Sequence, residues 1–234
     1  MTKLVLHIGM QKTGSTAIQR SLAANNGNGF VLPHLGGKPL KPLHRDALMQ
    51  LFPKSSEQLT NRPIQKGRNL DVVADPVHQI RLAAAKTNTV ILSSEGIAKI
   101  DLRKFASFAR ELFDDVVVVG YVREPISLMS AAFWTSIRAY PAAGFNLGRL
   151  PYRSYWIFDK IFGRENVQLW RYDKSDFPDG DIVQHFCSRL GLPKLTSENR
   201  NETVSRPAVA ATYRLNRGLR GANWMPSSAS APQL

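Results

Sequence analysis

The segment HIGMQKTGSTAIQRSL, residues 7–22, has the composition of a phosphate-binding loop that leads into a helix. Gly9 and Gly14 keep the glycine spacing of the nucleotide-triphosphate loop G-x-x-x-x-G-K-[ST]. Ser15, however, stands where that loop has its lysine, and Lys12 lies inside the loop. In a triphosphate enzyme the lysine spans the β and γ phosphates, and the next hydroxyl holds magnesium. This loop is therefore better suited to a shorter phosphate group.

Successive backbone N–H groups and hydroxyl side chains of this loop can surround an anion at the positive end of the helix. The side chains that could point at such an anion are those of Lys12, Thr13, Ser15 and Thr16. By itself, KTGST is equally compatible with a turn that caps the following helix.

A second candidate group follows the valine-rich run VVVVGYV, residues 116–122. That run is apolar on both faces, as a central parallel strand is, so Arg123 would leave the strand at the edge where open α/β sheets bind ligands. Ser130 would lie on the next helix. A guanidinium matches phosphate oxygens in bidentate fashion, so these two residues could hold a second phosphate. Alone, Arg123 would more often be a surface charge or part of a structural ion pair.

Together, the two groups resemble the sulfotransferases that use 3′-phosphoadenosine 5′-phosphosulfate. Lys12 to Thr16 match the family's first signature, K-T-G-T/S-T, and the resemblance implies that they bind the 5′-phosphosulfate. Arg123 and Pro125 match the second signature, in which an arginine, often followed by x-Pro, holds the 3′-phosphate. The similarity, mostly to bacterial members, covers about residues 3–220 and is weak over 27–85.

The chain departs from the family at the serine of the second signature. Family members usually place it eight residues after the arginine, which is Ala131 here, whereas Ser130 comes one residue early. A shift of one position turns a side chain by about 100° on a helix, so Ser130 is a weaker candidate than Arg123. The resemblance also implies that Tyr172, in NVQLWRYDKSDF, lies near the adenine. The predicted donor-binding residues are thus Gln11, Lys12, Thr13, Gly14, Ser15, Thr16, Arg123, Ser130 and Tyr172.

An in-line displacement needs a base for the acceptor and positive charge near the departing phosphate. Lys12 and the loop N–H groups would supply the charge, and no metal is required. Two residues are candidates for the base. An unperturbed His44 titrates near pH 6.5, which favours it chemically, whereas Glu95 follows a strand whose end should face the donor. Their alternative roles are an exposed histidine that opens a helix and a helix-capping carboxylate.

The rest of the sequence predicts strands that alternate with helices. Short apolar runs predict strands at 3–9, 89–95, 116–122 and 166–172. Helical spacing of apolar residues predicts helices at 17–26, 43–52, 75–86, 101–113, 125–140, 152–163, 179–192 and 206–217. This order predicts a three-layer α/β/α fold with a central parallel sheet, like that of P-loop NTPases. One domain would span 1–220, and 221–234 would be a disordered tail.

The composition adds an excess of positive charge. The 31 Lys and Arg residues against 18 Asp and Glu residues give a net charge of +13, which attracts polyanionic cofactors, acidic glycans or nucleic acid. No run of five or more Lys and Arg residues occurs, and no basic helix is interleaved with stacking aromatics. Nucleic acid is therefore not the predicted partner.

Other features favour a cytoplasmic protein. Cys187 is the single cysteine, lies among apolar residues at helical spacing, and excludes an intrachain disulfide. The apolar run at the N-terminus is too short for a signal peptide or a membrane span. No Cys/His cluster has the spacing of metal ligands, and His7, inside the first strand, is expected to be packed in the core.

The predicted protein is a sulfotransferase that moves a sulfuryl group from the nucleotide donor to a hydroxyl or amine of a small molecule or glycan. Two alternatives stay open. A small nucleotide or metabolite kinase with a degenerate loop would depend on magnesium. A basic nucleic-acid-binding protein would lose binding steeply with salt and show no turnover. The sequence indicates neither the acceptor nor the oligomeric state.

Overall fold

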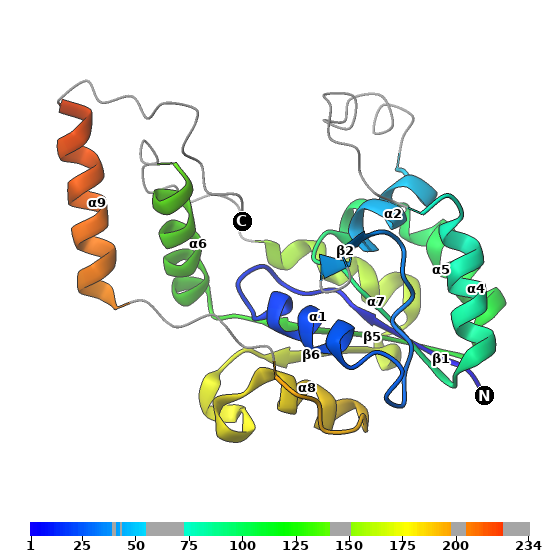
Figure 1. The fold of residues 1–234 in the computed structure, drawn as a ribbon. Coiled ribbons are helices and arrows are strands. Elements are labelled where there is room, and N and C mark those ends of the chain that lie inside the picture. Colours follow the sequence, from blue (N-terminus) through cyan, green and yellow to red (C-terminus); the bar gives the residue numbers. More distant parts are fainter. Residues whose placement is uncertain (39–40, 43, 55–72, 141–150, 198–204, 222–234) are drawn as a thin grey trace. The chain divides into compact units, whose positions relative to one another are not determined.

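The computed structural model describes residues 1–38, 41–42, 44–54, 73–140, 151–197 and 205–221 (Figure 1). Its main feature is a sheet of four strands in the order β4-β1-β5-β6, in which every neighbouring pair is parallel. The strands are β1 Lys3–His7, β4 Thr89–Ser93, β5 Asp115–Val122 and β6 Val167–Arg171. The predicted parallel sheet is confirmed.

Helices connect the strands, as crossovers between parallel strands require. Every predicted helix is present: α1 Ser15–Ala24, α2 His44–Leu51, α4 Pro76–Lys86, α5 Leu102–Leu112, α6 Pro125–Ala139, α7 Trp156–Phe162, α8 Ile182–Leu190 and α9 Arg206–Gly221. Three of them begin where an aspartate side chain accepts N–H groups of the first turn, as N-cap residues do. These caps are Asp75 before α4, Asp101 before α5 and Asp181 before α8.

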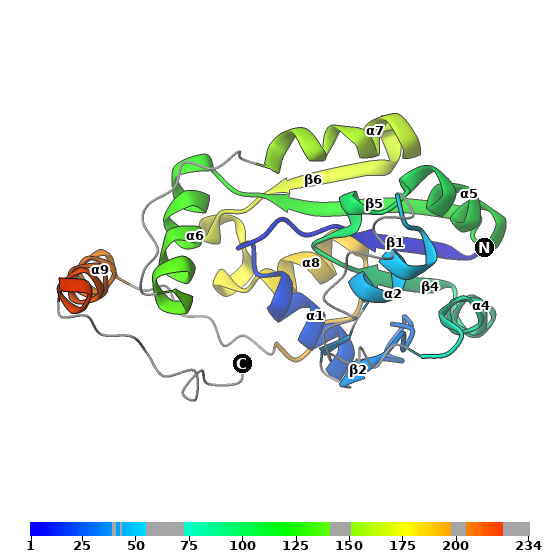
Figure 2. The same ribbon diagram turned by 90° about the horizontal axis from the view of Figure 1, so that it is seen from above.

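Helices lie on both faces of the sheet, which gives the predicted three layers (Figures 1 and 2). Helices α1 and α8 pack over one face, where Ile18 and Phe186 join Val5 of β1 in one buried cluster. On the other face, the ring of Phe105 in α5 lies 6.4 Å from that of Phe162 in α7. The four consecutive valines of β5 are all buried, and since successive strand residues point to opposite faces, both faces of this strand are covered.

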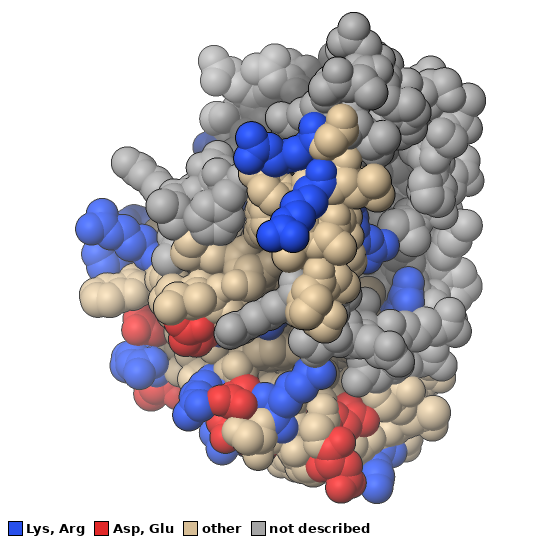
Figure 3. Space-filling model, turned by 90° about the vertical axis from the view of Figure 1, so that its left-hand side faces the viewer, with Lys and Arg blue, Asp and Glu red and all other residues tan. Residues whose placement is uncertain are grey.

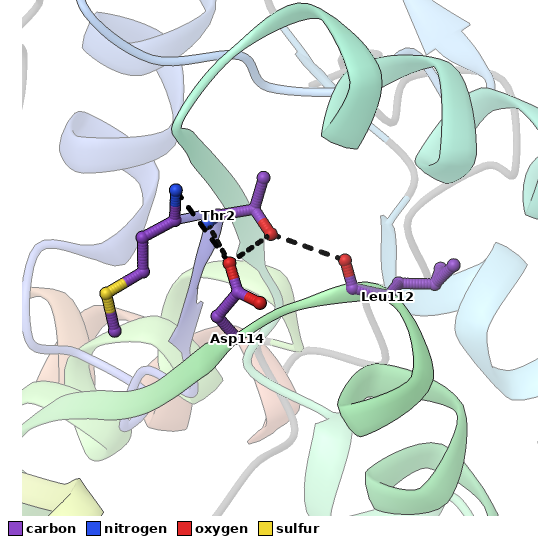
Figure 4. Close-up of polar contacts among 4 residues, drawn as sticks. Thr2, Leu112 and Asp114 are labelled. Atoms are coloured by element: carbon purple, nitrogen blue, oxygen red, sulfur yellow. Dashed lines mark hydrogen bonds and ion pairs between the residues drawn. The ribbon is translucent and has the colours of Figure 1, made fainter.

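The amino end of the chain is tied to the start of β5 (Figure 4). The Thr2 N–H donates to the Asp114 carboxylate over 2.6 Å. The Thr2 hydroxyl lies 3.3 Å from the same carboxylate and 3.5 Å from the Leu112 carbonyl. The amino group of Met1 lies 3.9 Å from the Asp114 carboxylate. The hydrogen bonds from Thr2 and the charge of the amino terminus together lower the pKa of Asp114. Strand β1 is thereby anchored at the end opposite to the candidate loop.

The chain divides into two compact units. The first combines Met1–Glu124 with Leu150–Asn201 and contains the four-stranded sheet. The second combines Pro125–Arg149 with Glu202–Leu234 and contains α6 and α9. A single domain over 1–220 stays a prediction.

Within the second unit, the contacts between α6 and α9 include an aromatic pair and a hydrogen bond. The rings of Phe133 and Tyr213 lie 5.4 Å apart. The side-chain amide of Asn216 donates to the Ile137 carbonyl over 2.9 Å. The predicted tail lies outside the described residues apart from its first residue, Gly221.

One element is not foreseen from the sequence. Strands β2 Gly37–Lys38 and β3 Lys41–Pro42 form a small antiparallel pair in a region for which the sequence predicts no strand. Strands of two residues have no hydrophobic period by which to recognise them. Just before them, Val31 pairs in parallel with Val90 of β4, so this segment runs along the outer edge of the sheet.

The positive charge is not gathered into one strip on the face drawn in Figure 3, where Lys and Arg side chains form several separate groups. Asp and Glu side chains lie beside some of these groups. Helices α6 and α9 contain no acidic residue, and Arg138, Arg214 and Arg217 are exposed on them. Among the described helices, none combines the length and the apolar character that crossing a membrane requires.

Candidate active site

The carboxyl ends of the four parallel strands meet at one edge of the sheet, and each is followed by a residue or loop with a predicted function. Glu95 follows β4, the loop 8–14 follows β1, Arg123 follows β5 and Tyr172 follows β6. Because the strand order is β4-β1-β5-β6, the loop has Glu95 on one side and Arg123 with Tyr172 on the other. This is the edge at which open α/β sheets bind ligands.

The loop between β1 and α1 is a tight turn with three residues in the left-handed region. Gly9, Lys12 and Gly14 have φ angles of 68°, 62° and 72°. At Gly9 the absence of a side chain also makes space, since a Cβ there would lie 3.0 Å from Cγ of Glu95. Lys12 is not a glycine, so its conformation has an energetic cost of the kind that occurs mainly at functional sites. The backbone therefore holds this lysine in a specific place.

The Thr13 hydroxyl is bonded to the backbone inside the loop. Its side chain is buried, and its hydroxyl donates to the Met10 carbonyl over 2.6 Å and accepts the Met10 N–H over 3.3 Å. The hydroxyl therefore closes the loop from inside, because the turn leaves the backbone groups of Met10 in need of partners. A role of Thr13 in donor binding stays a prediction. Ser15 is also buried, with its hydroxyl 3.1 Å from the same carbonyl. Gln11 and Thr16 are exposed.

Arg123 and Tyr172 come together against the loop. The Arg123 guanidinium donates to the Lys12 carbonyl over 2.5 Å and lies over the Tyr172 ring, 4.9 Å from its centroid. The Tyr172 N–H donates to the Val122 carbonyl over 2.8 Å, which places the ring beside the end of β5. The hydroxyl of Tyr152 donates to the Arg123 carbonyl over 2.6 Å. Residues from four segments of the chain thus form one cluster of positive charge and aromatic surface.

Ser130 belongs to the second unit. It is exposed on α6, and its hydroxyl donates to the Ile126 carbonyl over 2.8 Å, a common bond for a serine within a helix. Ala131, at the family's usual serine position, is partly buried. A role of Ser130 in phosphate binding stays a prediction.

Glu95 retains exposed surface on the other side of the loop, with several polar groups around its carboxyl. Desolvation by the surrounding protein raises the pKa of this carboxyl, whereas the Ser15 hydroxyl and the charges of Lys12 and Arg45 lower it. Desolvation is the largest of these causes, so the net shift of the pKa is upward. An accessible carboxyl with a raised pKa beside a lysine is suited to accept a proton from a bound acceptor.

His44 is buried at the start of α2, which corrects the expectation of an available imidazole. Its Nδ1 accepts the Ser93 N–H over 3.1 Å, and its Nε2 lies 2.8 Å from the Pro33 carbonyl. Since the N–H can only donate and the carbonyl can only accept, the ring is neutral with its proton on Nε2. Burial lowers the pKa of His44 to about 4. Both nitrogens are used within the protein, so the geometry favours Glu95 over His44 as a base.

Sequence reasoning missed two further residues of this site. The side chain of Arg45 lies over Gly96, where an added Cβ would be 2.7 Å from Cδ of Arg45. Tyr155 is buried, and this burial, with a smaller contribution from the charge of Glu95, raises the pKa of its hydroxyl. Neither has a motif of its own, and only the position of Arg45 beside His44 could have drawn attention to it.

His7 is buried, as expected, with Nδ1 2.7 Å from the Ser93 hydroxyl. Its ring meets that of Phe186 edge-on at 5.3 Å. Burial lowers the pKa of His7 to about 4. Together with His44, it makes Ser93 a point where β1, β4 and α2 are joined by buried polar groups.

Neither a protein-family model nor a curated protein sequence matches this chain. Among solved structures, it is similar to a sulfotransferase from Alicyclobacillus acidocaldarius, with 15% identity, 93% of this chain and 94% of that chain covered, and a TM-score of 0.50. It is also similar to the sulfotransferase domain from the Synechococcus PCC 7002 olefin synthase, with 16% identity, 97% and 90% coverage and a TM-score of 0.45. A gluconokinase from Sinorhizobium meliloti 1021 has 14% identity, 95% and 98% coverage and a TM-score of 0.34.

At these identities the likeness concerns the fold alone, and the two TM-scores below 0.5 carry no argument. The chain therefore has an α/β fold like that of the Alicyclobacillus sulfotransferase. What it binds and transfers has to be inferred from the side chains at the edge of its sheet.

Proposed function

We propose that this protein transfers a sulfuryl group from 3′-phosphoadenosine 5′-phosphosulfate to a hydroxyl or amine acceptor. The observation that carries the proposal is the order of side chains along the carboxyl edge of the sheet. Arg123 and Tyr172 lie on one side of the loop with Lys12, and Glu95 lies on the other. One side offers positive charge and an aromatic ring to a nucleotide, and the other offers a base to an acceptor.

The residues on the nucleotide side fit a donor with two separate phosphate groups. The first N–H groups of α1 have no acceptor inside the helix, so they can bind the 5′ phosphate together with Lys12. A guanidinium carries five N–H donors, so Arg123 can bind a 3′-phosphate while it also holds the Lys12 carbonyl. The Tyr172 ring beside it offers a surface for adenine.

The bound donor would supply an activated sulfuryl group. Lys12 and the loop N–H groups would stabilise the negative charge that develops on the departing phosphate. Glu95 would take the proton from the acceptor, because its carboxyl is accessible and its pKa is raised. We propose Glu95 rather than His44 for this role, since both nitrogens of His44 are bonded to backbone groups.

The acceptor would be a small molecule or a glycan that approaches from the Glu95 side. Arg45 is exposed there, and the net charge of the chain is +13, which favours an acidic acceptor. The proposal includes a cytoplasmic location and a reaction without a bound metal. Neither nucleic acid nor a membrane is part of it.

A thermal-shift experiment tests the nucleotide side directly. We expect adenosine 3′,5′-bisphosphate to raise the unfolding temperature clearly, ATP and AMP to raise it little, and magnesium to change none of the three shifts. Equal shifts for the three nucleotides would remove the argument for a 3′-phosphate site. A shift for ATP that requires magnesium would instead support a kinase.

A further inference from the structure

Glu95 follows β4 on a short segment whose polar groups are bonded to two buried histidines. The Ser93 N–H donates to Nδ1 of His44 over 3.1 Å, and the Ser93 hydroxyl lies 2.7 Å from Nδ1 of His7. The Ser94 N–H donates to the His7 carbonyl over 2.9 Å. Both serines and both histidines are buried. The segment that carries Glu95 is therefore held by residues of β1 and α2.

His44 can hold Ser93 because its own position is fixed. Its Nε2 donates to the Pro33 carbonyl over 2.8 Å. Two residues earlier, the Val31 N–H donates to the Thr89 carbonyl of β4 over 2.9 Å, so the acceptor of His44 is tied to the same edge of the sheet. The ring stays neutral at ordinary pH, and its unprotonated Nδ1 remains an acceptor for the Ser93 N–H.

We propose that His44 is a positioning residue, which fixes the backbone at Ser93 and thereby sets where the Glu95 carboxyl lies relative to Lys12 and Ser15. In this arrangement His44 contacts neither the sulfuryl donor nor the sulfuryl acceptor. It acts on the reaction only through its hydrogen bond to Ser93. The inference rests on the proposed function, in which Glu95 is the base.

The space around Glu95 is small enough for a displacement to matter. A Cβ on Gly9 would lie 3.0 Å from Cγ of Glu95, and one on Gly96 would lie 2.7 Å from Cδ of Arg45. A base must be within hydrogen-bond distance of the proton that it takes, and a misplacement of about 1 Å can reduce a rate about 10²-fold. Loss of the bond between His44 and Ser93 would therefore lower turnover without removing a nucleotide-binding group.

Two substitutions separate the two bonds of His44. His44→Asn retains an acceptor at the position of Nδ1, whereas His44→Gln retains a donor at the position of Nε2. If His44 acts through Ser93, we expect kcat to stay within about threefold of wild type in His44→Asn and to fall about 10- to 100-fold in His44→Gln. Affinity for adenosine 3′,5′-bisphosphate should be unchanged in both, and His78→Ala, an exposed histidine on α4, is the control.

Amide hydrogen exchange gives a readout that does not need turnover. The Ser93 amide should stay protected in His44→Asn and exchange faster in His44→Gln. Equal kcat values or equal Ser93 protection in the two variants would overturn the proposal. Loss of turnover in His44→Asn with the Ser93 amide still protected would also overturn it, because His44 would then act as the base itself.

The wild-type protein provides a further test if the variants do not fold. Nitrogen-15 spectra of the His44 ring should show Nδ1 unprotonated and Nε2 protonated from about pH 5.5 to 8. A His44 that titrates near pH 6.5 would contradict the positioning role. The proposed function has a separate test, because it fails if adenosine 3′,5′-bisphosphate does not stabilise the wild type. Even in that case, the nitrogen-15 spectra show whether the His44 ring is held neutral as proposed.

Discussion

The two sides of the loop are built in different ways. On the nucleotide side, both Arg123 and Tyr172 are partly exposed; the Arg123 guanidinium lies over the Tyr172 ring and donates a hydrogen bond to the Lys12 carbonyl. On the Glu95 side, Glu95 itself is exposed, but the segment that precedes it is hydrogen-bonded to two buried, neutral histidines, His7 and His44. The first arrangement depends on charge, and the second depends on hydrogen bonds shielded from water.

This difference has a consequence for how each side fails. Charged groups near the surface are sensitive to salt and to substitution one at a time. Buried polar groups depend on one another, because removing one leaves its partner unsatisfied. Substitutions on the nucleotide side should therefore act on binding, whereas changes on the Glu95 side should act on turnover and on folding.

The largest effect is expected at Glu95. Glu95→Gln keeps the shape of the side chain but removes the base, so turnover should fall by about 10²- to 10⁴-fold. Affinity for adenosine 3′,5′-bisphosphate should remain near wild type. Single-turnover kinetics and nucleotide titration measure the two quantities, with Glu111→Gln, an exposed glutamate on α5, as the matched control. A variant that keeps most of its turnover would mean that Glu95 is not the base.

Acid should weaken the Glu95 side through its histidines. Burial lowers the pKa of both His7 and His44 from 6.5 to about 4, so the unfolded chain binds more protons between these values. The free energy of unfolding should thus be independent of these groups above pH 6.5 and fall as pH decreases from 6.5 towards 4. Across this window each histidine should lower the free energy of unfolding by about 3 kcal/mol, at 1.36 kcal/mol per pKa unit.

Urea unfolding at a series of pH values measures this loss. The contribution of His44 is the difference between the wild type and His44→Asn, which cannot take up that proton. His78→Ala should follow the wild-type curve. Identical curves for the wild type and His44→Asn would show that His44 is not buried neutral in the folded protein.

Arg123 tests the nucleotide side. Arg123→Ala should weaken the binding of adenosine 3′,5′-bisphosphate by about 1.5–3 kcal/mol, as expected for a charge-assisted hydrogen bond, and weaken the binding of AMP much less. The affinity of Arg123→Lys for the bisphosphate should lie between those of the wild type and Arg123→Ala, since lysine keeps the charge and loses the planar guanidinium. Calorimetric titration of both nucleotides gives the comparison. Equal losses for the two would indicate that Arg123 acts through the Lys12 carbonyl instead of a 3′-phosphate.

Ser130 should have the smallest effect. Its hydroxyl is hydrogen-bonded within its own helix, so Ser130→Ala should weaken the binding of the bisphosphate by about 0.5 kcal/mol or less. Ser136→Ala, further along α6, is the control, because its hydroxyl donates in the same way to the Ala132 carbonyl. A loss as large as that in Arg123→Ala would show that the shifted serine reaches the phosphate.

The sequence by itself was sufficient for the parts of the protein that are set locally. Short apolar runs and helical spacing predicted the four strands of the parallel sheet and the α-helices that the structure describes, because these patterns follow from which faces are buried. The glycines at 9 and 14 and the arginine after the valine run indicated the edge of the sheet where a ligand would bind. The order of strands then places these segments together, since carboxyl ends of parallel strands share one edge.

Only the tertiary structure decided what individual polar side chains do. From sequence, Thr13 was as good an anion ligand as Ser15, and His44 was a better base than Glu95 by its ordinary pKa. Folding turned the Thr13 hydroxyl onto Met10 and buried His44 between Ser93 and Pro33. Burial and hydrogen-bond partners come from segments far apart in the chain, and they alone determine whether a hydroxyl or an imidazole is available for chemistry.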